Sequence, residues 1–191
     1  MVYIQWRGNR KVPVPIFSLP PVITCIGATE SCKRICYGKK SWIYPAVRKR
    51  RMENYNDSQK PDFVDKMIAE MKKHKFDKFR IHETGDFYSQ EYLDKWIAIA
   101  KAFPKVRFLA YTKSWQLDFS KIPKNLIIYY SVMPDTRHFP KTKMPYAYVI
   151  GKSLTYKSKV TGFDCPYPEK GCKECGYKCW DGGDNVIFKR H

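Results

Sequence analysis

Two stretches of the chain place apolar residues at the spacing of one helical face. The first runs from Pro61 to about Lys73, and the second begins after Ser89, which can cap a first turn, and ends before Pro104. The apolar positions of the first are Phe63, Val64, Met67, Ile68 and Met71, and those of the second are Tyr92, Leu93, Trp96, Ile97, Ala100 and Phe103. A further helix is predicted from Tyr44 to Tyr55, because a first turn tolerates Pro45.

Between and after these helices the period changes to that of strands. Apolar or aromatic runs of strand length, bounded by Pro, Asp, Lys and Gly, span Lys78 to His82, Val106 to Tyr111, Leu126 to Val132 and Ala147 to Ile150. Helices that alternate with buried strands favour a parallel sheet. With about four or five strand candidates, a complete eight-stranded barrel is excluded. We therefore predict an α/β fold with an open, mostly parallel sheet or a partial (β/α) barrel.

The length of 191 residues is that of one domain with a short appendage. We predict an α/β domain over residues 1–164 and a Cys-rich, metal-binding C-terminal tail over residues 165–191 that packs on it. The first 24 residues contain four prolines and should run extended and irregular. Hydrophobic residues make up 43% and aromatics 16%, which excludes a disordered chain.

The chain carries 36 Lys plus Arg against 18 Asp plus Glu, a formal charge of +18. Such a surface attracts polyanions, so nucleic acid is one candidate partner. The densest run is Arg48 to Arg51, and such a run is more often a solvated helix face than a reader of bases. No apolar run approaches the roughly 18 residues of a membrane span, and residues 1–10 lack the apolar core of a secretory signal. We expect no membrane partner and a cytoplasmic location.

Seven cysteines cannot all pair within one molecule, and free thiolates that bind metal explain the number better. Cys25, Cys32 and Cys36 form a C-x6-C-x3-C group on a glycine-containing loop. Three thiolates can hold a [4Fe–4S] cluster and leave one iron open to an exogenous ligand. The alternative is that the three are buried as small hydrophobic residues.

The other four cysteines lie within 15 residues near the C-terminus, in a C-x6-C-x2-C-x3-C pattern. They are Cys165, Cys172, Cys175 and Cys179. Four thiolates close the coordination of either a zinc ion or a second [4Fe–4S] cluster. The spacing alone leaves iron and zinc open at this site.

Three blocks of the sequence resemble the gene product 88 family of phage proteins. They are the cysteine loop that ends in Cys32 to Tyr37, the His82 to Phe87 block followed by Tyr111 to Lys113, and the tail from Cys165 to Trp180. Together they cover most of the chain from about residue 17 onward. The resemblance implies a phage origin, and with it the cytoplasm of the host cell.

The first cysteine loop is also similar to that of radical S-adenosylmethionine enzymes, in which three cysteines, the last followed by an aromatic residue, hold a cluster near the start of a partial barrel. Cys36 and Tyr37 fit that detail, whereas the usual spacing there is C-x3-C-x2-C. The resemblance implies S-adenosylmethionine as a cofactor. The candidate cofactor-binding residues are Tyr37, Glu83, Thr84, Gly85, Asp86, Lys113 and Ser131.

For most of these candidate residues, the sequence allows a structural role as well as a role in binding the cofactor. By the resemblance, residues 84–86 would present backbone to the amino end of the cofactor, but Gly85 and Asp86 would also fit a simple turn or a helix cap. His82 and Glu83 are neighbours on a strand end, so their side chains should point to opposite faces and only one can line the site. Lys113 and Ser131 follow hydrophobic runs at the carboxyl ends of strands, where crevices form, although for each alone a surface or hydrogen-bonding role is the stronger explanation.

Our leading hypothesis is a radical S-adenosylmethionine-type redox enzyme with a three-Cys cluster, a four-Cys auxiliary cluster and an electron donor as partner. The rival is a basic zinc protein that binds nucleic acid, with Trp180, Tyr177 and Tyr167 stacking on bases. A third hypothesis is an accessory protein whose metal only stabilises a small core. No side chain is assigned a catalytic role, and the sequence predicts neither substrate nor oligomeric state.

Overall fold

The computed structural model describes residues 2–150 and 160–189, so part of the predicted first domain and the last two residues of the tail lie outside it. These residues form an eight-stranded sheet in the order β1-β2-β3-β4-β5-β6-β8-β7. The strands are β1 (Ile4–Gln5), β2 (Ile16–Phe17), β3 (Lys78–Ile81), β4 (Arg107–Thr112), β5 (Leu126–Val132), β6 (Tyr146–Ile150), β7 (Phe163–Asp164) and β8 (Val186–Lys189).

Neighbouring strands are parallel from β2 to the β7 edge, and only β1 runs antiparallel to its neighbour. The sheet does not close, because β1 and β7 lie at opposite edges. An α/β fold with an open, mostly parallel sheet is therefore confirmed. All four predicted strands are present, each with ends within about one residue of the prediction.

The helices are α1 (Glu30–Ile35), α2 (Gly38–Trp42), α3 (Pro45–Ser58), α4 (Phe63–Met71), α5 (Gln90–Ala102) and the short 3-10 helix η2 (Lys178–Trp180). The three predicted helices correspond to α3, α4 and α5. The side chain of Ser89 caps α5 by accepting a hydrogen bond from the backbone N–H of Tyr92 at 3.2 Å. In the described ranges, no helix is both long and apolar enough to cross a membrane.

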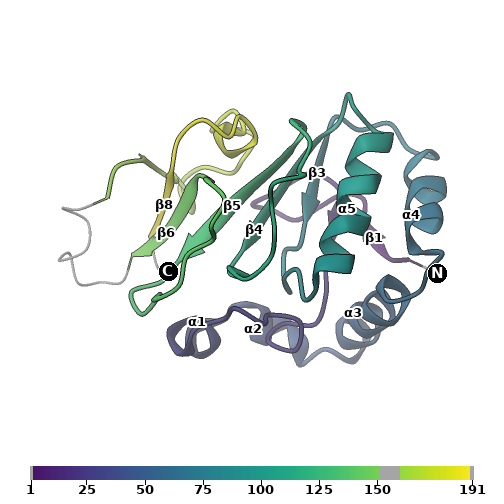
Figure 1. Cartoon of the computed structure of the whole chain (residues 1–191), viewed down its shortest axis with the longest axis horizontal. Helices are drawn as coiled ribbons and strands as arrows, with labels where there is room; N and C mark the ends of the chain where they lie inside the picture. Colours follow the sequence, from purple (N-terminus) through teal and green to yellow (C-terminus); the bar gives the residue numbers. More distant parts are fainter. Residues whose placement is uncertain (1, 151–159, 190–191) are drawn as a thin grey trace.

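Helices α4 and α5 cover one face of the sheet (Figure 1). Their side chains Phe63 and Trp96 meet Phe17 of β2 with ring centroids 5.8 and 5.4 Å apart, and Phe79 of β3 packs on the same indole. All four are fully buried. Burial of each such side chain stabilises the fold by about 1.5 to 3 kcal/mol, so this aromatic layer is the main core.

The cysteine-rich tail covers the opposite face of the sheet, where a doubly wound fold would place further helices (Figure 1). Trp180 is 2% exposed and packs in one cluster with Leu109 of β4 and Tyr129 of β5. The same segment then enters the sheet as β8, between β6 and β7. The tail is thus packed on the rest of the chain, and it also contributes a strand.

Candidate metal and cofactor site

The three-Cys loop lies over the carboxyl ends of the parallel strands. It leaves β2 and is bound at once to the end of β3, where the backbone N–H of Leu19 donates to the carbonyl of Thr84 at 2.9 Å. The hydroxyl of Thr84 donates back to the carbonyl of Leu19 at 2.8 Å. Thr24, just before the first cysteine, is buried and donates to the carbonyl of Pro20 at 2.9 Å.

Glycines allow this loop to touch the sheet with its backbone. A Cβ on Gly27 would lie 1.7 Å from the carbonyl oxygen of Lys113, at the end of β4. Gly85, at the end of β3, has a φ of +88° and would bring a Cβ within 2.5 Å of Leu19. Only glycine fits either position, so the loop is packed on two strand ends. Gly85 therefore makes the turn after β3, as the turn interpretation predicts, and its close approach is to Leu19 of the chain itself. Close approach of this backbone to a cofactor stays a prediction.

Helix α1 carries the loop to the end of β5. The side chain of Thr29 caps α1 by accepting a hydrogen bond from the N–H of Cys32 at 3.3 Å. The carboxylate of Asp135, which follows β5, accepts a hydrogen bond from the N–H of Ser31 at 2.9 Å. The three cysteines therefore lie on a segment fixed to the ends of three neighbouring strands.

Asp86 joins the ends of β3 and β4 beneath this loop. Its Oδ1 accepts hydrogen bonds from the hydroxyl of Thr112 at 2.6 Å and from the N–H of Phe87 at 2.7 Å. Its Oδ2 accepts from the N–H of Lys113 at 2.7 Å. Burial raises the pKa of Asp86, and these hydrogen bonds oppose that rise. Asp86 does not cap the following helix, since Ser89 does so.

The thiols of the three-Cys loop influence one another. Burial raises the pKa of Cys25 to about 12, and the Asp86 carboxylate and the thiols of Cys32 and Cys36 push it in the same direction. Burial also raises the pKa of Cys32, while the ammonium group of Lys113 opposes that shift. All three are free thiols. If all three thiols were ionised, the thiolates would repel one another. A bound cation would offset this repulsion and stabilise the ionised form.

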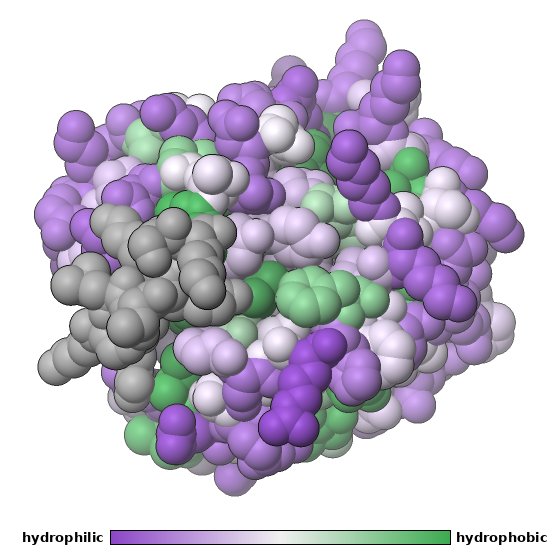
Figure 2. Space-filling model, turned by 60° about the vertical axis from the view of Figure 1, so that its left-hand side comes forward, coloured by the Kyte–Doolittle hydropathy of each residue, from purple (hydrophilic) through white to green (hydrophobic). Residues whose placement is uncertain are grey.

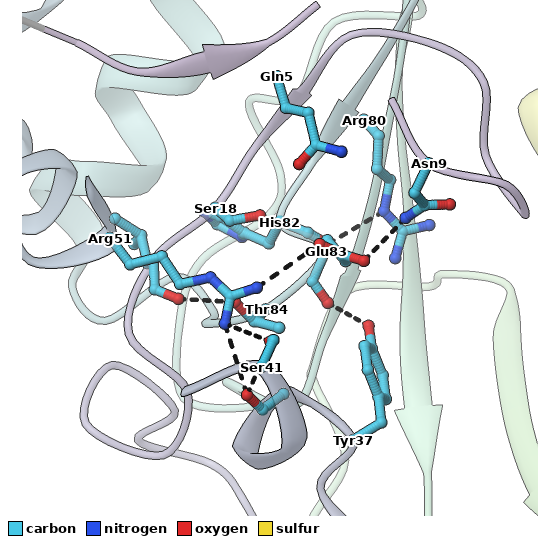
Figure 3. Close-up of polar contacts among 12 residues, drawn as sticks. Gln5, Asn9, Ser18, Tyr37, Ser41, Arg51, Arg80, His82, Glu83 and Thr84 are labelled. Carbon is cyan, nitrogen blue, oxygen red and sulfur yellow. Dashed lines mark hydrogen bonds and ion pairs between the residues drawn. The ribbon is translucent and has the colours of Figure 1, made fainter. Parts of the chain in front are cut away.

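Glu83 lies in a polar cluster between Arg51 and Asn9 (Figure 3). Its carboxylate lies 3.6 Å from the guanidinium of Arg51 and accepts a hydrogen bond from the amide of Asn9 at 2.8 Å. Arg51 also donates to the hydroxyl of Ser41 at 3.0 Å. Tyr37 donates its hydroxyl to the backbone carbonyl of Glu83 and so fixes the end of the cysteine loop.

His82 and Glu83 point to opposite sides, as predicted. His82 is 2% exposed, and its Nε2 lies 2.8 Å from the hydroxyl of Tyr92 in α5. Burial lowers the pKa of His82 to about 3, with Arg80 as a smaller cause. His82 is therefore a neutral core residue.

The remaining candidates separate into two groups. Thr84, Gly85, Asp86 and Lys113 are brought together under the loop by the contacts above. Ser131 is buried in β5 beside Ala147 of β6, and takes no part in the hydrogen bonds that hold the loop among the described residues.

Sequence reasoning missed Arg51, Asn9 and Asp135, each of which binds the site from a distant segment. Arg51 belongs to the basic run that also fitted a solvated helix face. Its three basic neighbours are exposed, but its own side chain is only 9% exposed. Burial sets Arg51 apart from its neighbours because its side of the helix faces Gly38 and Ser41. The sequence alone does not show which side of the helix faces these residues.

The four-Cys group lies on the tail and is anchored at two points. The N–H of Cys172 donates to the carbonyl of Lys11 at 2.9 Å, and the N–H of Cys165 donates to the carbonyl of Ile187 in β8 at 2.8 Å. Burial raises the pKa of Cys172 to about 12, and the thiols of Cys175 and Cys179 add to the shift. For Cys179, burial raises the pKa to about 11, and a hydrogen bond from Tyr111 opposes this.

Neither group of cysteines is gathered into a ready-made coordination site. Across residues 2–150 and 160–189, no three side chains of His, Cys, Asp or Glu have the arrangement that holds a metal ion. Metal binding at the seven cysteines therefore stays a prediction. The prediction that Trp180 stacks on bases is wrong for this structure, because the indole is buried against the sheet.

Sequence comparisons supply the relatives of the chain. The profile of the family described as gene product 88 matches residues 3–153. The gene 88 protein of Mycobacterium phage L5 is 30% identical over an alignment 226 positions long, which covers 98% of this chain and 92% of that protein. The gene 88 protein of Mycobacterium phage D29 is 29% identical, with the same coverage. No solved structure matches significantly. The chain therefore belongs to the gene product 88 family, which has members in mycobacteriophages.

Proposed function

We propose that the chain is an iron–sulfur protein of the radical S-adenosylmethionine type. Cys25, Cys32 and Cys36 would hold a [4Fe–4S] cluster with one open iron, and the four-Cys group would hold a second metal centre. The observation that carries the proposal is the position of the three-Cys loop over the carboxyl ends of parallel strands. Ligands of open α/β sheets bind at that edge.

The donor set fits such a cluster in its chemistry. The loop offers three free thiols that are close enough to raise one another's pKa, and the Lys113 ammonium lies beside Cys32. The thiols are not pre-gathered, so binding would bring them together. Such coupling between metal binding and local folding is common, because a preformed site costs thiolate repulsion in the empty protein.

The residues around the loop have separate roles in this proposal. The bound cluster and cofactor would supply an electron and a substrate radical, with electrons coming from a partner donor. Gly85 allows the backbone of residues 84–86 to approach a ligand closely. Asp86 holds the ends of β3 and β4 at a fixed separation, and Lys113 offers a positive charge at the same edge.

The four-Cys group has a closed donor set that suits either zinc or a second [4Fe–4S] cluster. Its position on the far face of the sheet, packed on Tyr111 and Tyr129, suits a structural or electron-relay centre. Either metal would stabilise the tail against the sheet, because the described part of the tail has little regular structure besides η2 and β8.

The test is anaerobic purification followed by iron, sulfide and zinc analysis, with electron paramagnetic resonance of the reduced protein. About eight irons per chain, or about four with one zinc, and a spectrum that shifts on adding S-adenosylmethionine, support the proposal. Cys32→Ser with Cys36→Ser should abolish the shifting signal, whereas Cys172→Ser with Cys175→Ser should leave it. Zinc alone, with no labile sulfide, would refute the iron–sulfur function.

A further inference from the structure

Exposed apolar side chains gather on the loops at the carboxyl edge of the sheet. Among the described residues, the large hydrophobic side chains that stay exposed are Ile23, Ile26, Tyr37, Ile43, Tyr44, Trp115 and Phe139. Three of them lie on the three-Cys loop, Trp115 lies on the loop after β4, and Phe139 lies on the loop between β5 and β6. Exposed apolar groups in one region often mark a binding surface.

Two of these side chains are held as aromatic platforms. Trp115 is 38% exposed and stacks on His138, with ring centroids 4.6 Å apart and an angle of 22° between the planes. Phe139 is 48% exposed and rests against Tyr130, with centroids 5.7 Å apart. The hydroxyl of Tyr130 also donates to the carbonyl of His138 at 2.5 Å. The rings are therefore positioned before any ligand arrives.

The loop between β5 and β6, which carries His138 and Phe139, also carries cations without counter-charges. Arg137, Lys141 and Lys143 are exposed, and none forms an ion pair within the described residues. The acidic residue of the loop, Asp135, already binds the N–H of Ser31. Hydrophilic side chains dominate the periphery of the face in Figure 2, with a few hydrophobic ones toward its centre. We call Trp115, Arg137, His138, Phe139, Lys141 and Lys143 the aromatic–cationic rim.

We propose that the aromatic–cationic rim binds single-stranded nucleic acid. Exposed rings accept stacked bases, and lysines and arginines at the same place bind phosphates, which is the combination that single strands require. A duplex keeps its bases stacked inside and leaves the rings unused. The net charge of +18 favours this polyanion over an acidic patch on a protein, because it attracts a long phosphate backbone from all sides. The rim is distinct from the buried Trp180, and the proposal does not depend on which metal the cysteines hold.

The first test measures fluorescence anisotropy of a labelled oligothymidylate of about 20 nucleotides, and of a duplex of equal length, with the anaerobically purified full chain. The rim variant carries Arg137→Gln, Lys141→Gln and Lys143→Gln. The matched control carries Lys72→Gln, Lys75→Gln and Lys105→Gln, which are exposed and lie near the amino ends of β3 and β4. Both triple variants remove the same charge.

We expect the rim variant to bind the single strand at least about tenfold more weakly at moderate salt. Its slope of log affinity against log salt should fall by about two, because each lost phosphate contact removes about 0.7. The control variant should keep most of the affinity and slope. Equal losses in both variants would overturn the proposal, since they would mean diffuse attraction to the whole surface.

The second test addresses the rings. Trp115→Ala should weaken single-strand binding about fivefold or more, and Trp115→Phe should recover most of it, because a ring remains to stack. Circular dichroism and metal content must match the parent for both variants. No effect of Trp115→Ala, duplex binding as tight as single-strand binding, or no binding of either would overturn the proposal. Because metal content is measured separately, these outcomes leave the iron–sulfur function untouched.

Discussion

The hydroxyl of Thr112 donates a hydrogen bond of 2.6 Å to the carboxylate of Asp86 and so joins the carboxyl ends of β3 and β4. The two residues are 26 positions apart in sequence and both are buried. The second carboxylate oxygen accepts from the N–H of Lys113. Gly27 packs on the carbonyl of the same lysine. The Asp86 carboxylate therefore fixes the strand ends against which the three-Cys loop packs.

Replacing Asp86 by Asn should destabilise the protein by about 2 kcal/mol. An amide group would turn its N–H toward the N–H of Lys113 or of Phe87, and leave a buried donor without an acceptor. Urea unfolding of parent and variant, at equal metal content, measures the change. Asp118→Asn is the control, because the Asp118 side chain is exposed and accepts from the N–H of Ser120 at 2.8 Å. A change in Asp86→Asn no larger than in this control would contradict the expectation.

Gly27→Ala should lower the metal content of the three-Cys loop without changing that of the four-Cys group. The new methyl group would fall 1.7 Å from a backbone oxygen, and no rotamer change can relieve that contact, so the loop must move away from β4. We expect the metal of the three-Cys loop to be lost or much reduced while that of the four-Cys group is retained.

Gly183→Ala is the matched control for Gly27→Ala, because a Cβ at Gly183 would meet nothing within 4 Å. Its metal content should equal that of the parent. Loss of metal from both groups in Gly27→Ala would show that the two sites do not load independently. An unchanged metal content in Gly27→Ala would show that the loop need not rest on β4 to bind metal.

The long elements of the fold could be predicted from the sequence because each has a clear period. Leu126 to Val132 is an apolar run bounded by turn residues, and it forms β5 with those ends. The two-residue strand β2 gave no such signal, since it follows a proline and is fixed by pairing with β3, which is distant in sequence. Strand β8 is likewise fixed by pairing with a distant partner, β6, which precedes it by some 40 residues.

The sequence predicted those parts of the candidate site that lie in local motifs, and not the contacts between distant segments. The block at residues 84–86 and Lys113 meet because parallel strands share a carboxyl edge, which the strand pattern implies. The bond between Asp135 and Ser31 joins residues 104 positions apart, and no local pattern encodes it. Burial of Arg51 depends in the same way on where α2 lies against α3.

Buried His82 should make the protein lose stability as the pH falls. Burial lowers its pKa in the folded state to about 3, against about 6.5 in the unfolded chain, so only the unfolded chain binds a proton in that window. The stability that neutral His82 gives is full above about pH 6.5 and declines toward pH 3. Between pH 7 and pH 5 this residue alone should account for a loss of about 2 kcal/mol.

The matched variant for this pH effect is His82→Asn. The backbone φ of residue 82 is 64°, a left-handed conformation that asparagine tolerates better than most residues. Asparagine does not titrate, so unfolding free energies of parent and variant should converge by about 2 kcal/mol from pH 7 to pH 5. The other histidines are present in both proteins, so their contributions to the pH dependence cancel in the difference. Parallel pH curves would mean that the pKa of His82 is the same in the folded and unfolded states.

The ion pair of Arg51 and Glu83 should couple more strongly than a shorter pair on the surface. The two groups are 3.6 Å apart, but their side chains are only 9% and 27% exposed. Lys66 and Asp62 are 2.8 Å apart, with side chains 39% and 52% exposed, so water screens them. Double-mutant cycles with Arg51→Met and Glu83→Gln, and with Lys66→Met and Asp62→Asn, compare the two. We expect coupling of about 1 to 2 kcal/mol for the first pair and less than about 0.5 kcal/mol for the second. The reverse order would mean that separation, and not burial, decides the strength of these pairs.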